Sequence, residues 1–163
     1  MPSVSFDTLP NDARVWVFGA AAPIRGSAAE QLMTAVDTHL AQWRAHGVPL
    51  VCARDWRDDR FLAVAVDEAA TGASGCSIDG LFRVLTSIES AIGTSLVGGA
   101  TVFWRDARGD VVVGDRPIFR TLAAAGEITA ETCVFDTTVN TASDWRSNFE
   151  RPARETWHSH LIR

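Results

Sequence analysis

The glycine- and serine-rich segment 71–79 (TGASGCSID) carries the residues best suited to chemistry. Its glycines, Gly72 and Gly75, permit backbone angles at which consecutive N–H groups point into one concavity. A helix is predicted to begin near Ser77, and the free N–H groups at a helix start favour an anion or a thiolate. Cys76 directly precedes Ser77, where the pKa of a thiol can fall well below its free value. The segment therefore predicts an anion- or thiolate-stabilising pocket.

A structural interpretation is also open for the candidate binding residues, which are Ser74, Gly75, Cys76, Ser77 and Asp79. The glycines would make the bend between a strand and a helix, Ser77 would cap the helix, and Cys76 would fill a small apolar gap. Asp79 in the first turn would satisfy part of the helix start without any ligand. Caps and tight turns are commoner than anion sites, so the pattern by itself assigns no catalytic residue.

Cysteine chemistry at Cys76 would need a histidine within reach as a base. His46, just before Gly47 at the predicted end of the first helix, is the best candidate, and His158 is a second. A protonated His46 would also stabilise a helix C-terminus, which is a sufficient structural reason for its position. His39 is interpreted as a boundary residue beside the apolar stripe of the same helix.

A metal site is not expected. His158 and His160 form a His-x-His pair, and alternation would place both on one face of an extended segment. No cysteine or acid is spaced to complete a ligand set with them. The sequence therefore predicts neither a metal nor a cofactor.

The basic residues narrow the possible functions. All 15 are arginine, so the chain has no lysine for a Schiff base or a phosphate-binding loop. The arginines are scattered and the net charge is −5, which gives no basic stripe for nucleic acid. An unknown protein or a small anionic ligand is therefore the expected partner, and nucleic acid is not.

The cysteines and the hydropathy pattern bear on location. Three widely spaced cysteines, Cys52, Cys76 and Cys133, argue against a disulfide framework and for a reducing compartment. No apolar run approaches the length of a membrane helix, and the N-terminus does not have the pattern of a signal peptide. A cytoplasmic protein without membrane association is expected.

The predicted elements follow the order β-α-β-β-α-β-β-α-β. The first six match the split βαβ arrangement of ferredoxin-like domains, so an α+β fold is expected, with a mainly antiparallel sheet and helices on one face. A C-terminal βαβ extension and an irregular tail would follow. Residues 1–140 are expected to form a single domain and residues 141–163 a tail packed on it. The predicted strands are 14–20, 48–56, 60–66, 101–104, 111–113 and 132–135, and the predicted helices are 27–46, 77–92 and 118–125.

Four stretches of the chain resemble an uncharacterised family of small bacterial proteins that often carry the label "ABC transporter ATPase". They are NDARVWV (11–17), QWRAHG (42–47), RFLAVAVDEAATGASGCSID (60–79) and SNFERPARETWH (147–158). The likeness is densest at SGCSID. The label conflicts with the chemistry, because an ATPase of that kind needs a phosphate-binding lysine. The resemblance implies no established activity and no catalytic residue.

Two functions follow as hypotheses. The first is a non-enzymatic binding or interaction protein whose contact loop runs from Gly72 to Asp79. The alternative is a cysteine-dependent hydrolase or thiol-redox protein, with Cys76 as nucleophile and His46 as base.

Overall fold

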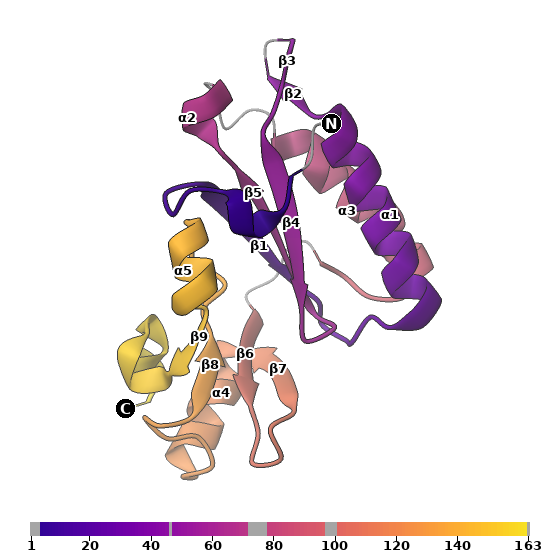
Figure 1. The fold of residues 1–163 in the computed structure, drawn as a ribbon. Coiled ribbons are helices and arrows are strands. Elements are labelled where there is room, and N and C mark those ends of the chain that lie inside the picture. The colour runs from indigo at the N-terminus through magenta and orange to yellow at the C-terminus, as the bar shows by residue number, and fades with distance from the viewer. Residues whose placement is uncertain (1–3, 46, 72–77, 97–100, 163) are drawn as a thin grey trace. The chain divides into compact units, whose positions relative to one another are not determined.

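A computed structural model describes residues 4–45, 47–71, 78–96 and 101–162. The chain divides into two compact units. The first comprises Met1–Gly98 with Val139–Arg146, and the second comprises Gly99–Thr138 with Ser147–Arg163. Each unit has its own antiparallel sheet and its own helices (Figure 1), so the predicted α+β class is confirmed. Within the described ranges, no helix combines the length and apolar character needed to cross a membrane.

A three-stranded antiparallel sheet forms the frame of the first unit. Its order is β1-β5-β4, with bounds Arg14–Gly19, Phe61–Val66 and Cys52–Arg57. This is the predicted split arrangement, in which β5 lies between β1 and the strand that follows the first helix. The hairpin from β4 to β5 turns through Asp58 and Asp59, both at a φ of 55°. Aspartate tolerates this left-handed region, so the predicted charged turn is confirmed.

Two helices cover one face of this sheet and pack against each other, α1 (Gly26–Gln42) and α3 (Ile78–Ile92) (Figure 1). Leu32, Val36 and Leu40 of α1 join Leu81 and Leu85 of α3 in the core. Their helical spacing places the core residues of each helix on one face of that helix, as the sequence predicted. Gly93 follows α3 at a φ of 78° and ends it, also as predicted.

The limits of α1 differ from the prediction. The helix begins at Gly26, one residue before the predicted start, with Arg25 in extended backbone before it. The helix ends at Gln42 rather than near His46. Beyond it, Trp43 is buried in extended backbone and a short hairpin follows, β2 (Arg44–Ala45) with β3 (Val48–Pro49). Burial of the indole therefore overrides the helical pattern.

The opposite face of the sheet is covered by η1 (Phe6–Thr8) and α5 (Ala142–Ser147). The indole N–H of Trp145 donates to Asp55 Oδ2 at 2.9 Å, and the Arg57 guanidinium lies 4.2 Å from the centroid of the same ring. The residues before α5 also occupy the outer edge of β1: Val15 N–H donates to the Asn140 carbonyl at 2.9 Å. This edge is where a ferredoxin-like domain would place its fourth strand.

That expected fourth strand lies in the second unit instead. β6 (Thr101–Arg105) belongs to a four-stranded sheet of order β7-β6-β8-β9. The other strands are Val111–Asp115, Cys133–Phe135 and Glu150–Pro152. The ferredoxin-like pattern therefore holds for the first five predicted elements and stops at the sixth.

The other elements of the second unit are α4 (Arg116–Ala124), η3 (Ala153–Glu155) and η4 (Trp157–Leu161). Phe119 of α4 packs among Val102, Trp104, Val134 and Leu161. The region after Asn140, expected to be irregular, thus contains a helix, a strand and two 3-10 turns. Each is too short to give a hydrophobic period in the sequence. A short α2 (Glu68–Thr71) completes the described elements.

Candidate functional site

Most of the predicted binding segment lies outside the described residues. This holds for Ser74, Gly75, Cys76 and Ser77, and also for His46. Asp79 is described, and its exposed side chain lies in the first turn of α3. The candidate site is therefore built from the residues that surround the two described ends of this segment.

A histidine from α1 contacts the start of α3. A Cβ on Gly80 would come within 3.1 Å of His39 Cε1 and 3.8 Å of His39 Nε2, so the imidazole edge packs directly on the glycine. A Cβ at this position would require the His39 ring to shift by a few tenths of an ångström. The structure thus places His39 at the helix start that follows Cys76.

The Nε2 atom of His39 is buried, and among the described residues nothing donates to it or accepts from it. Burial lowers the pKa of His39 below 6.5, and the nearby positive charge of Arg83 lowers it further. The imidazole is therefore neutral at pH 7. A neutral ring offers Nε2 as a donor or an acceptor, according to which nitrogen carries the hydrogen.

Aromatic rings hold His39 in place. Its ring centroid lies 5.3 Å from that of Trp43, which in turn lies 6.2 Å from that of Trp16. The guanidinium of Arg14 lies 4.8 Å from the Trp16 ring centroid and forms an ion pair with Glu68 at 3.5 Å. Glu68 begins α2, which leads into the glycine-rich segment. One row of side chains therefore links the elements on both sides of that segment.

The electrostatics at this position favour an anion. The first four N–H groups of an α-helix have no acceptor within the helix, and a partial positive charge resides there. The exposed Arg83 adds a full positive charge, while Asp79 opposes it. A small anion could accept from the backbone and from His39 together.

His39 was not singled out as a functional residue by its sequence pattern. It lies four positions before Trp43, at the margin of the apolar stripe of α1, and this position is compatible with a boundary residue. Its contact with Gly80 depends on how α1 packs against α3. Only that tertiary contact distinguishes His39 from a surface histidine.

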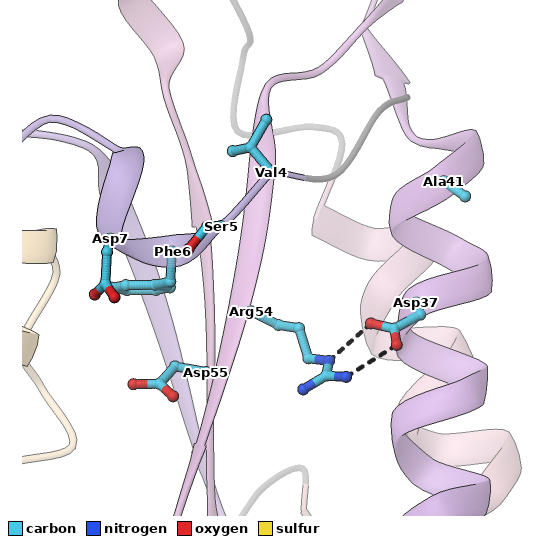
Figure 2. Close-up of a pocket in the computed structure, with 8 residues that line it drawn as sticks. All are labelled: Val4, Ser5, Phe6, Asp7, Asp37, Ala41, Arg54 and Asp55. Atoms are coloured by element: carbon cyan, nitrogen blue, oxygen red, sulfur yellow. Dashed lines mark hydrogen bonds and ion pairs between the residues drawn. The ribbon is translucent and has the colours of Figure 1, made fainter.

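The first unit also has a cleft of about 640 Å³ at the edge of β4 (Figure 2). Three of the four charged side chains that line it, Asp37, Arg54 and Asp55, already have partners. Arg54 donates from Nε and Nη2 to the two carboxylate oxygens of Asp37, at 2.7 and 2.9 Å. Asp55 accepts from Trp145 and lies 3.4 Å from Arg57. The cleft therefore offers a ligand fewer available charges than the start of α3.

Of the two cysteines that the structure describes, Cys52 does not resemble a reactive thiol. Cys52 is buried, its Sγ lies 3.6 Å from the Leu40 carbonyl, and burial raises its pKa to about 11. Cys133 is half-buried in β8. Within the described part of the chain, no group of three or more His, Cys, Asp or Glu side chains could hold a metal ion.

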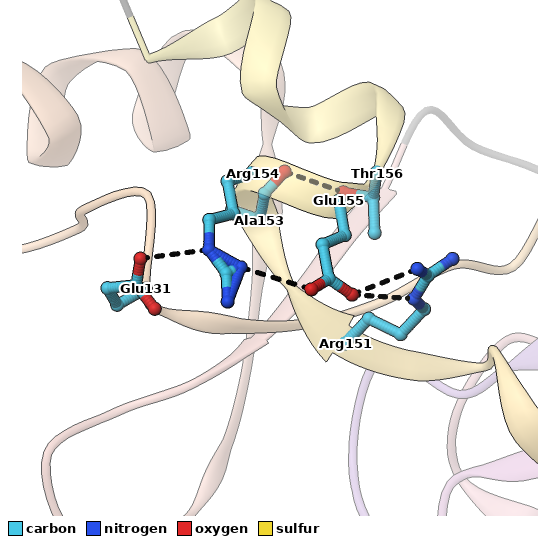
Figure 3. Close-up of polar contacts among 6 residues, drawn as sticks. All are labelled: Glu131, Arg151, Ala153, Arg154, Glu155 and Thr156. Carbon is cyan, nitrogen blue, oxygen red and sulfur yellow. Dashed lines mark hydrogen bonds and ion pairs between the residues drawn. The ribbon is translucent and has the colours of Figure 1, made fainter.

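In the second unit, His158 is buried between Trp157 and Phe119, with ring centroids 3.9 and 5.9 Å away. The Thr156 hydroxyl donates to the Ala153 carbonyl at 3.1 Å (Figure 3), so it accepts from His158 Nδ1–H at 2.8 Å. Nε2 is thus an unprotonated acceptor. Among the described residues, neither this atom nor the neighbouring Trp157 Nε1 has a hydrogen-bond partner.

Ion pairs anchor the segment that leads to His158. Glu131, Arg154, Glu155 and Arg151 form a chain of contacts of 2.9–3.1 Å (Figure 3). Backbone bonds from Arg154 N–H to Ala130 and from Ala153 N–H to Thr132, both 2.9 Å, add to it. His158 therefore belongs to a packed and anchored terminus, whereas His39 lies beside the candidate binding segment.

Comparison of the chain with models of protein families, with curated proteins and with solved structures finds no match. The resemblance suggested by the sequence therefore stays an expectation.

Proposed function

We propose that the chain is a binding protein that takes a small anionic ligand, such as a phosphate or carboxylate group, at the start of α3. The observation that carries this proposal is the Nε2 of His39 against Gly80, which has no hydrogen-bond partner among the described residues. The segment Gly72–Asp79 contributes through its sequence, which favours backbone N–H groups turned toward an anion. The expected cytoplasmic location is part of the same proposal.

In this proposal the ligand accepts one hydrogen bond from His39 Nε2–H and others from the first turn of α3. A hydrogen bond between a neutral donor and a charged acceptor contributes about 1.5–3 kcal/mol. Loss of the imidazole should therefore weaken binding by about tenfold or more.

Titration of isotope-labelled protein with inorganic phosphate at pH 7 tests the proposal. The amide signals of Asp79 and Gly80 should shift together with the ring signals of His39. The variant His39→Phe keeps an aromatic ring beside Trp43 but removes both nitrogens, and should lose most of the affinity. His160→Phe, at an exposed histidine of the second unit, is the matched control. Unmoved Asp79 and Gly80 signals at saturating phosphate would refute the anion site.

The same observation favours a second candidate, cysteine chemistry at Cys76. A neutral His39 whose Nε2 has no partner within the described ranges has the properties of a base, and it lies beside the first turn of α3, which follows Cys76. His46, which lies outside the described residues, stays the base that the sequence predicts.

Alkylation distinguishes the two functions. Thiol chemistry predicts that Cys76 reacts with iodoacetamide faster than Cys133 at neutral pH, and that His39→Phe slows only Cys76. Mass spectrometry of the peptides resolves the sites. If Cys76 reacts at an ordinary rate that His39→Phe does not change, the binding function alone is left.

A further inference from the structure

The second unit has a pocket of about 720 Å³, lined by the β6–β7 hairpin, α4 with the turn that follows it, and the start of β8. Pockets of roughly 300–1,000 Å³ are typical of sites for small organic molecules. The apolar part of the lining is Trp104, Leu122 and Ile128. Trp104 and Ile128 belong to the buried core of this unit, so the core holds this apolar wall in place.

Two carboxylates from different parts of the chain line the same pocket. Asp106 lies in the hairpin turn, where its Oδ1 accepts from the backbone N–H groups of Arg108 and Asp110 at 2.9 and 3.0 Å. These bonds fix the carboxylate and leave Oδ2 for a ligand. Glu127 lies in the turn after α4, and among the described residues its carboxylate has no hydrogen-bond or ion-pair partner. Both acids can therefore accept from a bound molecule.

The other charges of the lining are balanced. Glu131 Oε1 lies 3.1 Å from Arg154 Nε (Figure 3), which neutralises part of its charge. Arg105 is the basic residue of the described lining, and its Nε and Nη2 donate to the two oxygens of Glu150 at 2.7 and 2.8 Å. Its Nη1 donates to the Gly109 carbonyl at 2.9 Å. The unbalanced charge of the pocket is therefore negative.

The composition of the lining favours an organic cation over a metal ion. Metal ions such as Ca²⁺ and Mg²⁺ need several oxygen ligands around one point. Within the described ranges, no group of three or more His, Cys, Asp or Glu side chains could hold such an ion. An apolar wall beside two carboxylates instead matches a molecule that has an apolar body and a positive charge.

We infer that this pocket binds a small organic cation, an ammonium or guanidinium group on an apolar body. The charged group donates to Asp106 Oδ2 and to the Glu127 carboxylate. The apolar body packs against Trp104 and Ile128. This site takes the opposite charge from the site proposed at the start of α3, and it is independent of that proposal.

Titration of isotope-labelled protein with 2-phenylethylammonium chloride at pH 7 tests the inference. The methyl signals of Ile128 and the indole N–H signal of Trp104 should shift. The neutral analogue 2-phenylethanol should bind at least about threefold more weakly, and the anion 3-phenylpropanoate should leave both signals unchanged. Cys133 also lines the pocket, so the bound ammonium should slow its alkylation by iodoacetamide. Mass spectrometry of the peptides identifies Cys133.

Two conservative variants test the carboxylates. Glu127→Gln changes the charge of an exposed side chain and should weaken binding of the ammonium about threefold. Adding Asp106→Asn, which keeps Oδ1 as an acceptor in the turn, should raise the loss to about tenfold. Glu30→Gln, at an exposed glutamate of the first unit, is the matched control and should not change the affinity.

Three results would overturn the inference. The first is that millimolar ammonium leaves the Ile128 and Trp104 signals of the wild-type chain unmoved. The second is that 2-phenylethanol binds as tightly as the ammonium, because the carboxylates would then contribute nothing. The third is that the double variant of Glu127 and Asp106 binds the ammonium as tightly as the wild type.

Discussion

The surroundings of His39 and His158 show why burial alone does not make a histidine functional. Both rings have a buried Nε2 without a partner among the described residues, and burial lowers the pKa of both. His158 is 0% exposed and Thr156 holds its Nδ1. Apolar rings surround it, so no ligand can approach. His39 is half-buried beside the start of α3, next to Gly80 and Arg83.

This difference assigns the two histidines to different roles. His158 stabilises the terminus of the second unit as long as it is neutral. His39 has the same neutral form, but it lies where backbone donors and a positive charge meet. The predictions below test this division, from the largest expected effect to the smallest.

Removing the ring beneath His158 should have the largest effect. Phe119 is 0% exposed and its centroid lies 5.4 Å from that of Trp104 and 5.9 Å from that of His158. Phe119→Ala should lower the free energy of unfolding by about 3–5 kcal/mol, through lost burial and a cavity. Urea denaturation measures the loss. Arg120→Ala, on the exposed side of the same helix, should change the stability by less than about 0.5 kcal/mol. Similar losses for both variants would contradict the packing described for α4.

The pH dependence of stability should separate the two histidines. The pKa of His158 is about 4 in the folded chain. Burial lowers this pKa most, the charge of Asp136 raises it in part, and the charge of Arg116 lowers it again. In the unfolded chain the pKa is near 6.5. The contribution of neutral His158 to the free energy of unfolding is thus complete above pH 6.5. It is lost as the pH falls from 6.5 to 4, which lowers the free energy of unfolding by about 3 kcal/mol.

His158→Phe should remove most of that loss when denaturation curves at pH 7 and pH 4 are compared. His39→Phe should remove less, because His39 is only half-buried. An equal effect of the two variants would show that the histidines do not differ in burial as described.

Replacing Gly114 or Gly80 with alanine should change the stability by different amounts. A Cβ on Gly114 would lie 2.9 Å from the Trp104 ring, which is buried against Phe119 and cannot move. Gly114→Ala should therefore destabilise the chain by about 1–3 kcal/mol. Gly80→Ala meets the half-buried His39 ring at 3.1 Å and gains about 1 kcal/mol of helix propensity, so its net effect on stability should be small. Thermal unfolding of both variants measures the difference, and a larger loss for Gly80→Ala than for Gly114→Ala would contradict the contacts described at the two glycines.

Local signals explain which parts of the fold the sequence predicts. The turn at Asp58 and Asp59 and the stop of α3 at Gly93 depend on neighbouring residues, and both are confirmed. Tertiary contacts, rather than local sequence, determine which sheet β6 joins. Asn140 takes the edge of β1 that β6 was expected to fill, and no local pattern reports a contact between residues so far apart.

The candidate site was only partly predictable for the same reason. Asp79 and the helix start followed from the serine and glycine pattern. His39 did not, because its role depends on the absent side chain of Gly80 and on the packing of two helices. The remaining predicted residues lie outside the described ranges and stay predictions.

The smallest expected effect concerns ligand affinity. Sulfate keeps its charge between pH 5 and pH 8, so it reports the protonation of the protein alone. Binding should tighten severalfold as the pH falls and His39 takes up a proton, since the pKa of His39 in the free protein lies below 6.5. Calorimetry at several pH values measures this trend. In His39→Phe the tightening should disappear, and its persistence would assign the effect to another group.

The pKa of His39, followed through its ring signals by NMR with and without sulfate, tests the central claim most directly. We predict a pKa of His39 below 6.5 in the free protein that rises when sulfate is added, while sulfate leaves the ring signals of exposed His160 unchanged at constant pH. A His39 titration that sulfate leaves unchanged would contradict an anion site at the start of α3.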